Sequence, residues 1–129
     1  MNQDIQNLIK LLLNLHKELL ELEKHAYEKK NGVIASNGDY FNLVVGHPDF
    51  NWLRSFSEVI ALIDEEGEQK EIDWSKITAA LSSLQVMLEA NEKTEFSKRY
   101  GEVLNDNMYL LGLNGQVKSE IERVLRLKK

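Results

Sequence analysis

The fold is decided first by residues 5–26, which read IQNLIKLLLNLHKELLELEKHA. Apolar side chains recur in this run at alternating steps of three and four residues, which places them on one face of an α-helix. The stripe consists of Ile5, Leu8, Leu12, Leu15, Leu19, Leu22 and Ala26. The pattern predicts a helix over residues 3–30, and Asn31-Gly32 supplies a left-handed stop at its end. Neighbouring apolar residues widen the stripe, so we expect this helix to contact more than one partner helix.

Two more amphipathic helices follow in the middle of the chain. One is predicted from Pro48 to about Glu66, since Pro48 suits the first helical position and the apolar residues after it keep helical spacing. The next begins after Asp73, whose carboxylate is a favourable N-cap. An acidic linker separates the two helices and holds nearly all of the net negative charge, at residues 64–71.

The last third of the chain predicts two further helical stretches. The third helix is interrupted or kinked at residues 91–94, and the helical pattern then continues over about residues 96–105. Asp106 or Asn107 can cap a final helix. The fold class predicted is therefore all-α, an up-and-down helical bundle of about four main helices plus a short extra helix, in a single domain over residues 1–129.

Residues 33–46 allow two interpretations. Asn37-Gly38 lies between apolar residues and matches a type I′ turn of a small β-hairpin. The alternative is a loop followed by a short helix from about Asp39 to Val45. We favour the loop and helix, because an isolated two-stranded ribbon is only marginally stable.

Composition limits the function classes. The chain has 129 residues, a formal net charge of −5 and no cysteine, which excludes disulfides, thiolate metal sites and cysteine nucleophiles. Residues 1–4 lack the basic start of a signal peptide, and no apolar run approaches the ~20 residues of a membrane span. We expect a cytoplasmic protein without a membrane segment. The basic residues after position 117 are too few for a nucleic-acid footprint on an acidic protein, so no nucleic-acid partner is predicted.

The sequence lacks the motifs that usually bind metals or cofactors. Di-metal helical bundles use repeated Glu-x-x-His motifs, which this chain does not contain. His16 lies inside the apolar arc of the first helix and is interpreted as a structural or partly exposed side chain. No glycine-rich phosphate loop or Gly-x-Ser-x-Gly elbow occurs. We therefore expect no metal and no cofactor, and assign no catalytic residue.

The richest segment chemically is residues 47–57. His47 and Arg54 are seven residues apart, hence on nearly one side of an α-helix, with Ser57 one turn beyond Arg54. A guanidinium beside an imidazole at a helix start can hold a carboxylate or phosphate, so His47, Trp52, Arg54 and Ser57 are the candidate ligand-binding residues. The alternative is that Arg54 pairs with Glu58 or with an acid on another helix, while Trp52 belongs to the core or an interface.

The same segment carries a resemblance. The motif Pro48-x-Phe50-x-Trp52-Leu53-Arg54-x-Phe56-Ser57 resembles one found in an uncharacterised family of small all-helical bacterial proteins. The pattern of residues 96–104 is similar to that family's next helix, and the chain has Ser55 where the family motif has Pro. The resemblance implies an all-helical fold and no catalytic residue, since no activity is attached to the family.

Three hypotheses about function remain. The leading hypothesis is a non-enzymatic cytoplasmic module that acts by association, as a homodimer, because the wide first stripe together with Trp52, Trp74 and Tyr109 exceeds what one small bundle covers. The alternative is a small anionic ligand-binding protein or enzyme with a pocket around His47 and Arg54. A third hypothesis is an adaptor recognised through the acidic linker at 64–71.

Overall fold

The computed structural model of the chain describes residues 2–89 and 94–127. Within these residues every regular element is helical, which confirms the all-α prediction. The elements in chain order are α1 (Gln3–Asn31), α2 (Asn37–Gly46), the 3₁₀ helix η1 (Pro48–Leu53), α3 (Arg54–Gly67), α4 (Trp74–Leu88), α5 (Glu95–Asn105) and α6 (Met108–Leu127).

Residues 33–46 form a loop and a helix, so the hairpin interpretation is wrong. The Ser36 hydroxyl accepts a hydrogen bond from the backbone N–H of Asp39 at 3.1 Å. This N-cap satisfies one of the backbone donors left free at a helix start. It explains why α2 begins at Asn37 and runs to Gly46, slightly longer at both ends than predicted.

Side-chain caps also set the starts of α4, α5 and α6. Asp73 caps α4 as predicted, by accepting from the N–H of Ser75 at 3.0 Å. Thr94 caps α5, and the rest of the predicted interruption, residues 91–93, lies outside the described part of the chain. Asn107 accepts from the N–H of Leu110 at the start of α6, so it is the cap among the two residues predicted.

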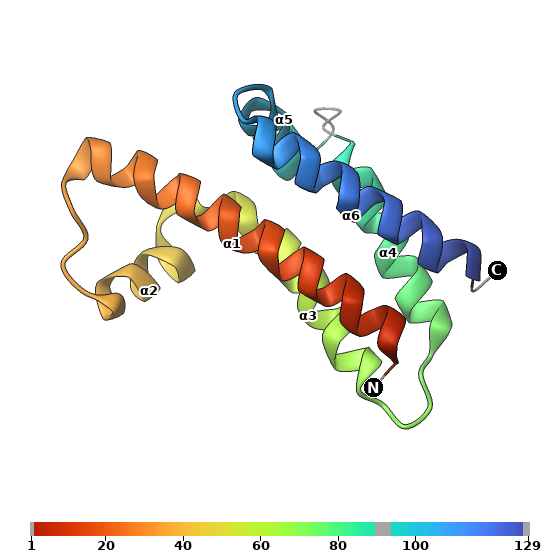
Figure 1. The fold of residues 1–129 in the computed structure, drawn as a ribbon. Helices are drawn as coiled ribbons and strands as arrows, with labels where there is room; N and C mark the ends of the chain where they lie inside the picture. Colours follow the sequence, from red (N-terminus) through yellow and green to blue (C-terminus); the bar gives the residue numbers. More distant parts are fainter. Residues whose placement is uncertain (1, 90–93, 128–129) are drawn as a thin grey trace.

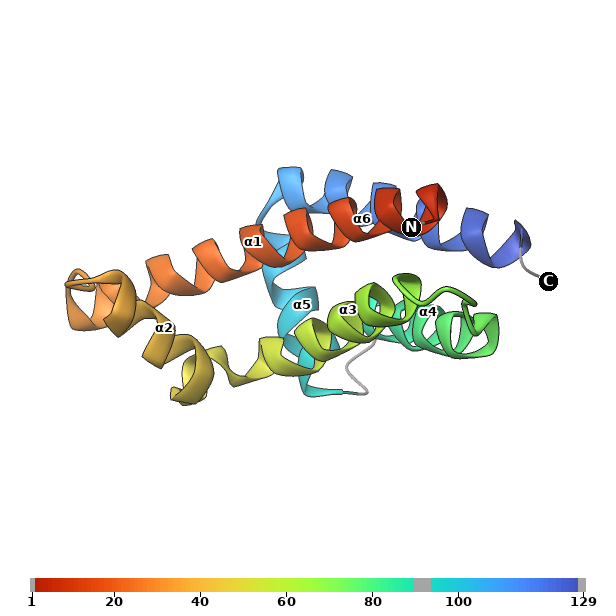
Figure 2. The same cartoon turned by 90° about the horizontal axis from the view of Figure 1, so that it is seen from below.

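The longer helices lie in two layers. Figure 2 shows α1 and α6 in one layer, α3 and α4 in the other, and α5 crossing from the end of α4 to the start of α6. Arg123 near the end of α6 contacts Asp4 at the start of α1 at 2.8 Å, so these neighbours run antiparallel. α2 lies beyond the layers, beside the last turns of α1 (Figure 1), and packs chiefly on η1.

The core follows the predicted stripes, with one displacement along α1. Residues from Ile5 to Leu19 on the predicted stripe are buried, whereas Leu22 and Ala26 are only partly buried and Glu23 is buried in their place. A straight α-helix has 3.6 residues per turn, so a strict seven-residue repeat drifts around its surface and the buried line moves to Glu23. A polar residue thus occupies the core-facing line where α1 passes η1.

No helix in the described part of the chain is both long enough and apolar enough to cross a membrane.

Candidate functional site

His47 lies between α2 and η1 and shapes the local backbone. Its Nδ1 accepts a hydrogen bond from the N–H of Asp49 at 3.1 Å, which caps η1. The imidazole packs edge-on against the ring of Tyr27, with the ring centres 5.2 Å apart. It lines a hollow between the end of α1, the following loop and α2, together with Tyr27 and Asp39 among others.

Arg54 and Ser57 line a different hollow, between α1, α2 and α3. The Arg54 guanidinium donates through Nη2 to the carbonyl oxygen of Val45 at 2.8 Å, and the Ser57 hydroxyl donates to the carbonyl oxygen of Arg54 at 3.2 Å. Arg54 has no carboxylate partner among the described residues, so the predicted pairing with Glu58 or another acid is wrong.

The structure does not bring His47 and Arg54 into one pocket. Their hollows have no lining residue in common. The reason is the 3₁₀ helix between them: a 3₁₀ helix has three residues per turn, so seven positions no longer return the chain to the same face as they do in an α-helix. The sequence prediction assumed an α-helix from Pro48 onward, and η1 turns His47 away from Arg54.

Trp52 is a core anchor. Its indole N–H donates to Oε1 of Glu23 at 2.7 Å, in a buried contact between η1 and α1. Arg99 of α5 reaches the same carboxylate at 3.6 Å and lies over the Trp52 ring at 5.9 Å from its centre. Because a buried carboxylate is costly without partners, this cluster fixes three helices relative to one another.

Sequence reasoning missed Glu23 and Arg99. The signal that could have found Glu23 is its position four residues after Leu19, on the line that a straight helix buries.

A hollow of about 400 Å³ beside Glu23, Trp52 and Arg99 is lined by charges of both signs. Its four acidic side chains nearly balance its three basic ones, so the lining has no strong preference for a charged ligand.

α2 is attached through Tyr40. The Tyr40 ring packs edge-on against Phe50 at 6.2 Å between ring centres, and the Lys24 ammonium lies 5.2 Å from its centre. The hydroxyl of Tyr40 is buried and has no hydrogen-bond partner among the residues that the structure describes. Burial, followed by the nearby carboxylates of Glu21 and Glu28, raises the pKa of this phenol, so it stays neutral.

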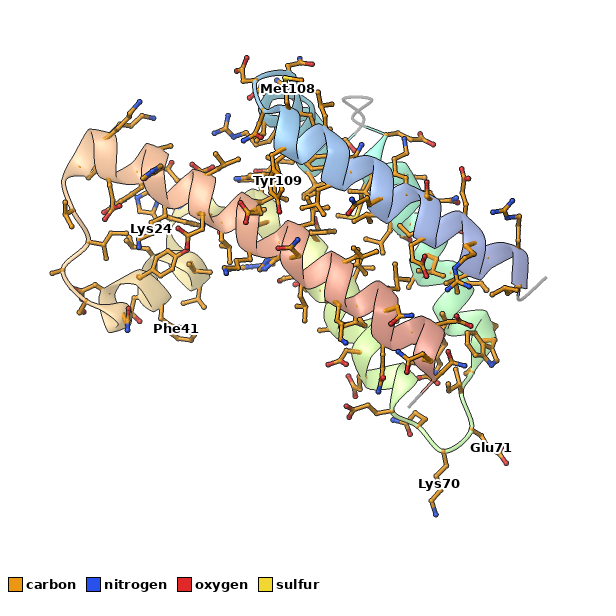
Figure 3. The ribbon with its side chains drawn as sticks, viewed as in Figure 1. Lys24, Phe41, Lys70, Glu71, Met108 and Tyr109 are labelled. Atoms are coloured by element: carbon orange, nitrogen blue, oxygen red, sulfur yellow. The ribbon has the colours of Figure 1, made fainter. Side chains whose placement is uncertain are left out.

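The first half of α6 carries three exposed apolar side chains. Met108 is 88% exposed, Tyr109 58% and Leu111 49%, and Figure 3 shows Met108 at the start of α6 with Tyr109 nearby. Sequence reasoning had named Tyr109, Trp52 and Trp74 as surplus apolar surface. Trp52 is buried and Trp74 is partly buried against the core, so only Tyr109 remains exposed.

In the part of the chain that the structure describes, no group of three or more His, Cys, Asp or Glu residues is placed to hold a metal ion. No protein-family model matches the chain, and the searches of curated proteins and of solved structures found no match either.

Proposed function

We propose that this protein acts by association, as a cytoplasmic homodimer in which the first half of α6 meets the same surface of a second copy. The observation that carries the proposal is that the first half of α6 exposes Met108, Tyr109 and Leu111. Tyr109 and Leu111 are two residues apart and lie toward opposite edges of the outer face, with Met108 between them. Exposed apolar surface on a small protein is typical of an interaction site.

Charge distribution supports a second copy as the partner. Charged residues make up 29% of the chain, yet residues 108–117 contain none. Depletion of charge is the compositional mark of an interface centre. In a two-fold dimer each patch meets itself, so an uncharged patch brings no like charges together and leaves no charge buried without a partner.

The size of the patch predicts a weak dimer. Ten residues of α-helix span about 15 Å, and a helix is about 10 Å wide. Such a face and its flanks bury a few hundred Å² per protomer, below the roughly 800 Å² of a standard interface. We therefore expect dissociation in the micromolar range.

The proposal uses a particular arrangement of the helices. In this arrangement the up-and-down bundle consists of α1, α3, α4 and α6. Two observations support it: the contact of Arg123 with Asp4 between antiparallel α6 and α1, and the packing of α1 on α3 and of α4 on α6. α6 then has its inner line, which includes Val117 and Ile121, in the core and its outer face free for a partner.

Equilibrium sedimentation at micromolar concentration tests the proposal. We expect a monomer–dimer equilibrium that Leu111→Glu shifts to monomer, because the substitution buries an unpaired charge in the dimer. Leu62→Glu is the matched control, since Leu62 is a similarly exposed helical leucine at 46% but lies on α3 in the other layer. A wild-type monomer at every concentration, or equal effects of the two variants, would contradict the proposal.

A further inference from the structure

We propose that the hollow between α1, α2 and α3 binds a short-chain aliphatic monocarboxylate, through the Arg54 guanidinium and the His16 imidazole. The hollow has a volume of about 160 Å³. It is lined by His16 and Leu20 from α1, Val44 and Val45 from α2, and Phe50, Leu53, Arg54 and Ser57 from the segment that follows. This inference is independent of the dimer.

The charges of the lining favour an anion. Arg54 uses Nη2 on the Val45 carbonyl oxygen, and its Nε and Nη1 donors have no partner among the described residues. No aspartate or glutamate lines this hollow. A guanidinium with spare donors and no lining acid is the arrangement that a carboxylate completes by charge-assisted hydrogen bonds.

His16 supplies a second polar group from another helix. Its ring lies 6.0 Å from the ring of Phe56, centre to centre, and its nitrogens have no hydrogen-bond partner among the described residues. Partial burial lowers the pKa of the imidazole, which therefore presents one N–H donor and one acceptor near neutral pH. Convergence of two donors from α1 and α3 is what orients a ligand in an otherwise apolar pocket.

The walls favour a carboxylate with an aliphatic chain over inorganic phosphate. Five of the eight lining residues are apolar, and a strongly hydrated phosphate would lose more water there than the donors of Arg54 and His16 replace. A hollow of this volume has room for a ligand of a few heavy atoms. A monocarboxylate of butyrate size places its carboxylate at Arg54 and His16 and its chain against Leu20 and Phe50.

Isothermal titration calorimetry with sodium butyrate tests the site, with 1-butanol and sodium phosphate as comparison probes. We expect butyrate to bind and both comparison probes to bind at least tenfold more weakly. Arg54→Gln and His16→Gln should each weaken butyrate binding by about tenfold, as expected for loss of a charge-assisted or a neutral donor to a carboxylate. His25→Gln is the matched control and should leave binding unchanged, because His25 is an exposed histidine of α1 that does not line this hollow.

Three results would overturn the inference: phosphate binding as tightly as butyrate, 1-butanol binding as tightly as butyrate, or His25→Gln weakening binding while His16→Gln does not. Because Arg54 also holds the Val45 carbonyl oxygen, Val44→Trp provides a test that keeps Arg54 intact. It fills the hollow and should abolish binding, and circular dichroism checks that each variant keeps its helical content. Binding that survives a folded Val44→Trp variant would also refute the site.

Discussion

Gly67 tests the packing of α3 against α1 at a single atom. It is the last residue of α3 and is buried. A Cβ placed on it would lie 2.8 Å from Cγ2 and 3.5 Å from Cδ1 of Ile5. Among the described glycines only Gly32 has a positive φ, so the backbone at Gly67 tolerates alanine without strain.

The expected magnitude follows from two opposing effects of Gly67→Ala. Alanine is favoured over glycine in a helix by up to about 1 kcal/mol, with less gained at the last residue. Forcing a methyl group into a filled core costs about 1–3 kcal/mol. Ile5 is fully buried, and its Cγ2 is bonded directly to Cβ, close to the backbone. We expect a net destabilisation of roughly 1–2 kcal/mol, because the overpacking exceeds the gain in helix propensity.

Urea unfolding followed by far-ultraviolet circular dichroism measures this change, at a protein concentration where the chain is monomeric. Gly112→Ala is the matched control: it lies within α6, and a Cβ there meets nothing within 4 Å. It should therefore stabilise the monomer by about 0.5–1 kcal/mol. If Gly67→Ala proves as stable as the wild type, or shifts in the same direction as Gly112→Ala, the close contact with Ile5 is refuted.

Two further predictions concern buried polar groups. Trp52→Phe should destabilise the protein by roughly 2 kcal/mol in the same urea assay, because it removes the hydrogen-bond donor to the buried Glu23 carboxylate. The destabilisation should be smaller in a Glu23→Leu background. An equal destabilisation in both backgrounds would argue against the hydrogen bond. Burial lowers the pKa of His16 in the folded protein below its ordinary 6.5. As the pH falls, the imidazole is therefore protonated in the unfolded chain before it is protonated in the folded one. The free energy of unfolding is thus unaffected by protonation of His16 above about pH 6.5 and decreases as the pH drops towards the pKa of the folded state. His16→Leu should remove that part of the loss, and stability profiles of wild type and variant that stay parallel between about pH 7 and 5 would contradict this.

Helix starts and core lines could be predicted because they depend on local chemistry. Asp73 and Asn107 accept hydrogen bonds from backbone donors within three residues, so their role is visible in the sequence. The stripe of α1 is likewise local as far as Leu19. Beyond Leu19, burial depends on a segment distant in the sequence. Glu23 is buried because the indole of Trp52, 29 positions along the chain in η1, contacts it.

The candidate site was predicted only in part, for reasons of helix geometry and distance in sequence. Arg54 and Ser57 share a hollow, as their spacing of three suggests. His47 does not join them, because the choice between a 3₁₀ and an α-helical turn at η1 rotates it away. His16 replaces it from α1, and spacing along the sequence carries no information about a neighbour that comes from a different helix.

The glycines of α6 bear on association in a way that the fold of one chain does not explain. Each glycine inside a helix costs about 0.5–1 kcal/mol relative to alanine. Neither Gly112 nor Gly115 has any atom within 4 Å of where a Cβ would stand, so packing within the chain does not require either one. Both lie in the uncharged half of α6, beside exposed Leu111. A second helix can approach α6 more closely at glycines than at residues that carry a Cβ atom. Close packing of a partner helix at this face would therefore offset the cost of both glycines to the stability of the monomer.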